Sequence, residues 1–132
     1  NKYDLSRKKR KVIDDRVWVE MEDEKIEDEK WLTGVYRDKK YKVSNMGRIH
    51  GKNGITRGSI KSGLYRKLHG AITVHRVVAF IWCSANLKDV MERTGLPASS
   101  LVVRHKNDNK DDNRAANLEW GTVLDNNMDR LS

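Results

Sequence analysis

The stretch VVRHKNDNKDDNRAANLEWGTVLDNN, residues 102–127, constrains the fold of this chain most strongly. After a single histidine, His105, the next 22 residues contain six asparagines and five acidic residues. Apolar segments at 99–105 and 118–122 enclose this polar run, and each has the length of a strand. Residues 125–131 then have the pattern of a helix that Thr122 caps. The sequence therefore predicts strand, polar loop, strand and helix, with His105 at the end of the first strand.

The asparagines and the histidine allow both a structural and a chemical interpretation. Asn side chains bond to nearby backbone groups, which holds a long loop in one shape. A histidine titrates near neutral pH and can act as a base, and an Asn carbonyl is an oxygen ligand of the kind that Mg²⁺ or Mn²⁺ accepts. A lone histidine at a strand end is nevertheless more often structural. Composition and pattern alone indicate a basic nucleic-acid-binding domain and leave metal dependence open.

The remaining sequence predicts a small α+β protein in three parts. Residues 1–30 carry runs of basic and acidic residues and are expected to form a charged N-terminal arm. Residues 31–73 form a basic, β-rich module, in which KYKVSNMGRIHG (40–51) predicts a strand, a turn and a strand. Residues 74–132 form the third part. There, VHRVVAFIW (74–82) is compatible with a helix, and LKDVMERTGLP (87–97) predicts a short helix that ends at its glycine and proline.

The net charge of +8 is concentrated in one part of the chain. Residues 34–76 contain 11 basic residues and one acidic residue, whereas residues 1–30 contain 9 and 10, and residues 77–132 contain 7 and 8. A local excess of this size is better explained by contact with a phosphate backbone than by solubility alone. A nucleic acid is therefore the expected partner, and the family resemblance given below implies that it is double-stranded DNA. The few aromatic residues, 7% of the chain, argue against an RNA-binding module that stacks bases.

Several classes of protein are excluded by simple features. Cys83 is the only cysteine, so neither a disulfide framework nor a multi-cysteine zinc site is expected. The longest apolar run, residues 77–85, is shorter than the about 20 residues that cross a bilayer. No signal-peptide pattern begins the chain. We therefore expect a soluble cytoplasmic protein. The basic run SRKKRKV (6–12) resembles either a nuclear import signal or a DNA-gripping arm, and the sequence does not decide between them.

Three segments together resemble the HNH endonucleases. HKNDNKDDNRAANLEWGTVLDN (105–126) is similar to the motif that gives the family its name. VHRVVAFIW (74–82) is similar to the segment that precedes the motif in homing-type members, and YKVSNMGRIHG (41–51) to a module often fused upstream. The resemblance covers about residues 31–130. It implies a phage-type homing endonuclease in a bacterial host, with a ββα-metal (His-Me finger) nuclease core preceded by a short-stranded β module.

The resemblance also implies roles for particular residues. His105 matches the general base and lies at the metal site, and Asn126 matches the ligand of one divalent cation, Mg²⁺ or Mn²⁺. Asn117 matches the asparagine that braces the catalytic loop, and Asn113 is expected to hold the same loop. The single motif implies a monomer that nicks one strand. Phosphate or DNA contacts are expected from Arg48, Arg57, Lys61, Arg66, Lys67, His75, Arg76 and Arg114.

Two positions depart from the family pattern. The homing enzymes carry a metal-binding Asp before the motif histidine, and Arg104 stands there instead. An arginine can bind a phosphate or stabilise negative charge in the transition state, so Arg104 is a candidate catalytic residue. Asp108 replaces the usual loop glycine. Two hypotheses follow: an active nuclease whose Asn126 holds the cation with waters and phosphate oxygens, or a weak or inactive DNA-binding protein on the same fold.

Overall fold

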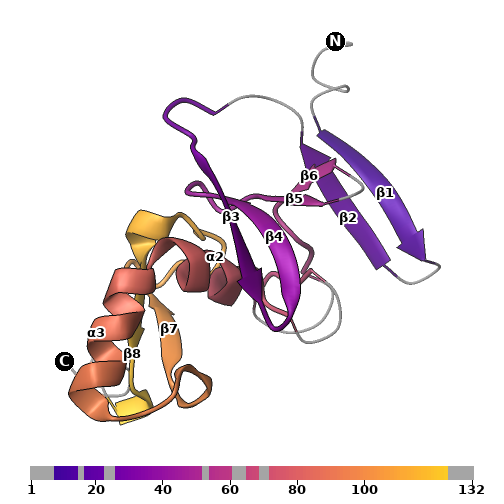
Figure 1. The fold of residues 1–132 in the computed structure, drawn as a ribbon. Helices are drawn as coiled ribbons and strands as arrows, with labels where there is room; N and C mark the ends of the chain where they lie inside the picture. The colour runs from indigo at the N-terminus through magenta and orange to yellow at the C-terminus, as the bar shows by residue number, and fades with distance from the viewer. Residues whose placement is uncertain are drawn as a thin grey trace.

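A computed structural model describes residues 8–14, 17–22, 26–51, 54–60, 65–68 and 72–124, and for residues 8–22 its backbone alone is considered. It confirms the predicted α+β class (Figure 1). Lys61 and Asn126 lie outside the described residues, as does the helix predicted at 125–131. Among the described residues, no helix combines the length and apolarity needed to cross a bilayer.

The first half of the chain forms a six-stranded antiparallel sheet with the order β1-β2-β6-β5-β4-β3. Its central hairpin pairs β3 (Trp31–Tyr36) with β4 (Lys39–Ser44), and β4 turns into β5 (Ile49–Gly51). This is the predicted strand, turn and strand. Alternation explains it, because Tyr41 and Val43 are buried while the lysines between and before them are exposed. The short β6 (Gly54–Thr56) joins this hairpin to β2.

The N-terminal charged segment differs from the expected arm. It contains β1 (Lys8–Asp14) and β2 (Val17–Glu22), which pair as a hairpin and extend the sheet through one pairing of Met21 with Thr56. The register sets Lys8 opposite Glu22 and Arg10 opposite Glu20. β-Branched and aromatic residues within these runs favour strands, and this preference outweighs the charge pattern.

Two helices connect the sheet to the second half. α2 (Val74–Trp82) and α3 (Ser84–Thr94) follow each other almost directly. Apolar spacing predicted α2, and α3 was predicted over 87–97 from the glycine and proline at its end, so it begins three residues earlier than expected. Gly95 ends α3 with a left-handed backbone (φ +72°), as its position before a proline indicated. α2 lies between the β3–β4 hairpin and the ribbon of β7 and β8, whereas α3 runs beside β8 (Figure 1).

The second half ends in a two-stranded ribbon of β7 (Val102–His105) and β8 (Leu118–Gly121), which confirms both predicted strands within a few residues. Short 3₁₀ turns precede them at Ala98–Ser100 and Ala115–Asn117. Among the residues whose burial is described, one buried core joins the sheet, α2 and the ribbon, and it includes Val43, Val77 and Trp120. The indole nitrogen of Trp82 also donates to the backbone oxygen of Val43 at 2.9 Å. α2 is therefore a central element shared by the sheet and the ribbon.

Candidate active site

His105 lies where β7 ends, opposite Leu118 of β8. Side chains alternate along a strand, so His105 and Val103 share the buried face of the ribbon with Leu118 and Trp120. Only 5% of His105 is exposed. The imidazole is therefore held at the edge of the core and next to the polar loop, which begins at the following residue.

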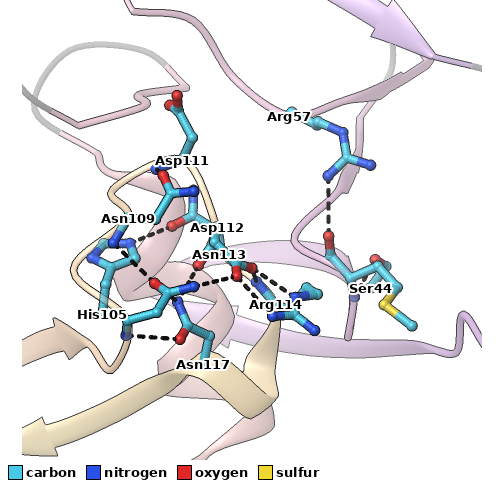
Figure 2. A network of polar contacts seen from close by, with 11 residues as sticks. Ser44, Arg57, His105, Asn109, Asp111, Asp112, Asn113, Arg114 and Asn117 are labelled. Atoms are coloured by element: carbon cyan, nitrogen blue, oxygen red, sulfur yellow. Dashed lines mark hydrogen bonds and ion pairs between the residues drawn. The ribbon is translucent and has the colours of Figure 1, made fainter.

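Asn113 is the hydrogen-bond partner of this imidazole. Its side-chain oxygen lies 2.7 Å from His105 Nε2, and Asn113 is itself buried. Figure 2 shows the two side chains within the cluster formed by the polar loop. One of the two ring nitrogens of His105 is thus engaged inside the protein, which leaves Nδ1 for any contact with a substrate, a water or a cation.

Two further rings pack against His105. The ring of Tyr65 is nearly parallel to it at a centroid distance of 6.0 Å, and the ring of His75 lies at 5.1 Å. Burial, together with the nearby His105 and Arg76, lowers the pKa of His75 to about 3. His75 was predicted to contact DNA, but the structure encloses it at the start of α2, where it is neutral at physiological pH. It therefore brings no charge to the site.

The loop between His105 and β8 is held by its own asparagines. Asn117 accepts a hydrogen bond from the backbone of Asn107 and donates to the side chain of Asn107 and to the backbone oxygen of Asp112. Asn107 and Asn109 each accept from a backbone N–H two residues further on. Asp108 has a left-handed backbone, with φ +61°, in the position of the family glycine. The density of short polar residues is thus explained by the shape of this loop.

Two acidic residues of the loop, Asp111 and Asp112, are paired with arginines. Both carboxylate oxygens of Asp112 accept from Arg114 at 2.7 Å, and these bonds lower the pKa of Asp112 to about 2. Asp111 pairs with Arg66 at 3.1 Å. Within the described ranges, no three His, Cys, Asp or Glu side chains are grouped as a metal site. Asn126, the ligand that the family resemblance implies, lies beyond the described residues.

Arg104 is directed away from the imidazole. It alternates with His105 along β7, and its Nε donates to Glu119 of β8 at 2.9 Å on the other face of the ribbon. The position before the histidine, which holds an acid in the homing enzymes, is thus occupied here by Arg104, and Arg104 forms an ion pair with Glu119 across the two strands.

Two predicted phosphate contacts have structural positions instead. Arg48 is 1% exposed and pairs with the buried carboxylate of Glu29. Arg76 donates to the backbone oxygens of Leu101 and Ala98, and its guanidinium lies 5.0 Å from the centre of the Trp120 ring. These contacts connect the sheet, α2 and the ribbon. Sequence patterns miss them because each depends on a partner distant in the chain.

Of the other predicted cations that the structure describes, Arg66 and Arg114 contact acidic residues of the polar loop. Arg57 donates to the backbone oxygen of Met46, and Arg66 reaches both Asp111 and the backbone of Gly58. Lys67 pairs through its backbone with Ser59 and Thr73. Arg114 is exposed beside Asp112 (Figure 2). The structure also brings Lys110 over the ring of Tyr65, at 5.9 Å, which no sequence signal indicated.

These features define a small α+β protein whose polar site is centred on one histidine at the end of a β ribbon. Residues 90–128 match the family model described as HNH endonuclease, so this segment of the chain is similar to that family. The resemblance predicted from the sequence is thereby confirmed.

A solved structure is also similar, and its title reads "DNA binding and cleavage by the HNH homing endonuclease I-HmuI". The identity is 31%, over 69% of this chain and 51% of that chain, with a TM-score of 0.46. The chain thus spans about half the length of that protein. Curated proteins gave no match.

Proposed function

We propose that this chain is a metal-dependent endonuclease that hydrolyses phosphodiester bonds in duplex DNA. The observation that carries the proposal is the position of His105: at a strand end, within the matched family segment, with one ring nitrogen bonded to Asn113 and a braced polar loop beside it. Hydrolysis of a phosphodiester requires a base for the attacking water and stabilisation of the charge that builds up on phosphorus. His105 is the residue suited to the first task.

The sequence assigned His105 both to the base and to the metal site, and we propose that it acts as the base. Because Nε2 is engaged by Asn113, only Nδ1 has an available lone pair. That nitrogen can take a proton from water or bind a cation, but it cannot do both at once. As a base, His105 removes the proton while the water oxygen bonds to phosphorus. The bond to the leaving 3′ oxygen then breaks, and the products are a 5′-phosphate and a 3′-hydroxyl.

The proposed cofactor is one divalent cation, Mg²⁺ or Mn²⁺. HNH nucleases generally use a divalent metal ion, and such an ion neutralises charge on the phosphate. Asn126, the ligand expected from the family pattern, would hold it together with waters and phosphate oxygens. Since Asp111 and Asp112 are paired with arginines, we assign no step to the cation through these two acids.

The proposed DNA contacts come from cations of the basic segment and of the polar loop. Five cations of the sequence prediction remain proposed DNA contacts: Arg57, Lys61, Arg66, Lys67 and Arg114. Three others have buried or structural positions, namely Arg48, His75 and Arg76. Lys40 and Lys42 are exposed on β4 within the most basic segment. These charges would bind the phosphate backbone and contribute affinity without reading sequence.

A plasmid assay tests the activity. With Mg²⁺ or Mn²⁺ we expect supercoiled plasmid to become nicked, because one motif addresses one strand, and a chelator should abolish the change. His105→Ala should lower the cleavage rate by about 10² to 10⁴, while Asn109→Ala, which removes only one exposed loop contact, serves as the matched control. A linear product without a nicked precursor would contradict nicking. Equal rates for the two variants would contradict the role of His105.

A second function is favoured by one observation. Arg104 stands immediately before His105, where the homing enzymes carry a metal-binding Asp. With Arg104 paired to Glu119, a chain of this family that binds DNA without cutting it is a coherent alternative. It predicts that DNA binding persists in His105→Ala and that no divalent ion supports cleavage by the natural sequence. Cleavage by the natural sequence and its loss in His105→Ala would reject this alternative.

A further inference from the structure

The side chain of Asn113 is placed to control the protonation pattern of His105. Asn113 is 5% exposed, and its side-chain oxygen lies 2.7 Å from Nε2. An amide oxygen accepts hydrogen bonds and never donates them, so this contact requires the hydrogen of the neutral imidazole to be on Nε2. The other nitrogen, Nδ1, is then the site that can accept a proton.

We propose that Asn113 is a positioning residue that selects the Nε2–H tautomer of His105, and that the turn at residues 44–47 holds Asn113 in place. The inference deepens the proposed function and rests on it, since the tautomer matters for catalysis only if His105 is the base. It gives Asn113 a role different from that of Asn117, whose side chain contacts the loop rather than the imidazole.

The turn approaches Asn113 too closely for any residue but glycine. Gly47 has φ +84°, and a Cβ there would lie 2.9 Å from both the carbonyl carbon and the oxygen of Asn113. The backbone N–H of Ala115 donates to the backbone oxygen of Asn45 at 2.8 Å, on the same side of the loop. The upstream turn and the loop of His105 are therefore packed backbone against backbone.

Hydrogen bonds within the turn, and to the residues that precede β3, hold the 44–47 turn in place. Ser44 Oγ accepts from the backbone of Met46 and Arg48, which closes the turn. The side chain of Asn45 accepts from the backbone of Lys30 at 2.7 Å and donates to the backbone oxygen of Asp28. The β module thus acts as a rigid support for Asn113, in addition to any DNA contacts it makes.

The rings beside His105 complete this arrangement. Tyr65 and His75 pack within 6.0 and 5.1 Å of the imidazole, centre to centre, and this packing restricts rotation of the ring away from Asn113. No charged group is needed for the selection, because His75 is neutral at physiological pH and the Asn113 amide carries no charge.

Nitrogen-15 NMR of the full chain, without DNA or added metal, tests the tautomer directly. At a pH where His105 is neutral, we expect the Nε2–H form in the natural protein and in Asn113→Asp, which keeps an oxygen acceptor. Asn113→Ala should show a mixture of tautomers, while Asn109→Ala should match the natural protein. An Nδ1–H form in the natural protein, or an unchanged tautomer in a folded Asn113→Ala, would overturn the proposal. This readout does not require cleavage, so it separates this inference from the proposed function.

Single-turnover cleavage measures the consequence for catalysis. Asn113→Ala should slow the cleavage step at saturating enzyme about tenfold or more, with DNA affinity changed by less than about twofold, because a wrong tautomer affects the chemical step. Asn113→Asp should recover much of the rate. Gly47→Ala, which displaces Asn113 without removing it, should shift the tautomer and the rate in the same direction as Asn113→Ala. A loss of affinity at an unchanged cleavage rate would contradict the proposal.

Discussion

Arg104 and Glu119 form an ion pair across the β7–β8 ribbon, with Arg104 Nε 2.9 Å from a carboxylate oxygen of Glu119. The pair occupies the face of the ribbon opposite His105. Both side chains are about a third or more exposed, at 32% and 41%. An ion pair of this kind contributes little to stability, because water screens it and ordering both side chains costs entropy.

Arg104→Ala is therefore expected to have small effects. The free energy of unfolding should fall by about 1 kcal/mol or less, and the nicking rate should change by no more than a few-fold. Denaturant unfolding and the plasmid assay measure the two quantities. A loss of activity by orders of magnitude in a folded variant would instead support the catalytic role that the sequence suggested for Arg104.

Arg48→Ala should be far more destabilising. Its partner Glu29 is 7% exposed, so removing the arginine leaves a buried carboxylate without its main counter-charge. The expected loss is about 3–5 kcal/mol in the free energy of unfolding. The double variant Arg48→Met with Glu29→Leu removes both charges and should lose less than Arg48→Ala. Equal losses in the two variants would show that the buried charge is not the cause.

The buried His75 predicts a specific dependence of stability on pH. Its pKa is about 3 in the folded protein and 6.5 in an exposed chain. Between these values the unfolded state binds a proton that the folded state does not, so the free energy of unfolding should fall as the pH falls, by up to about 1.4 kcal/mol per pH unit. Above about pH 6.5 this effect is absent.

His75→Phe removes this ionisation while keeping an aromatic ring. Urea unfolding between pH 4 and pH 7 should give a smaller slope for the variant than for the natural protein. The acidic residues contribute equally to both proteins, so the difference isolates His75. Identical slopes would mean that His75 takes up a proton in the folded state as readily as in the unfolded chain.

DNA binding should depend steeply on salt through the exposed lysines of β4. Each phosphate contact that is lost reduces the slope of log affinity against log salt by about 1. Lys40→Ala with Lys42→Ala should therefore flatten the slope by about 2 and weaken binding to all duplexes alike. Lys88→Ala, at an exposed position on α3, is the matched control. A slope unchanged by the β4 substitutions would place the DNA on another face.

Local patterns predicted the elements whose cause is local. The alternation in β4, the apolar spacing in α2 and the glycine that ends α3 are all set by residues within a few positions of each other. The hairpin of β1 and β2 was missed because its charge runs were given more weight than its β-forming residues.

The site was predicted only in part for a related reason. The motif located His105 and the loop, but the partner of the imidazole depends on how the loop folds back, and that conformation brings in Asn113. In the same way, the arginines were assigned by charge. Arg48 is buried against Glu29, which lies 19 residues before it, and Arg76 donates to the backbone oxygen of Leu101, 25 residues after it. Long-range packing of this kind leaves no local signal.

The position of α2 has a consequence for how such a nuclease would meet its target. Because one helix is packed on both the sheet and the ribbon, no hinge separates the lysines of β4 from the imidazole of β7. The distance between the phosphates that the lysines bind and the phosphodiester bond that is cut would then be fixed by the fold. A fusion of the N-terminal sheet to another nuclease domain would therefore have to include α2.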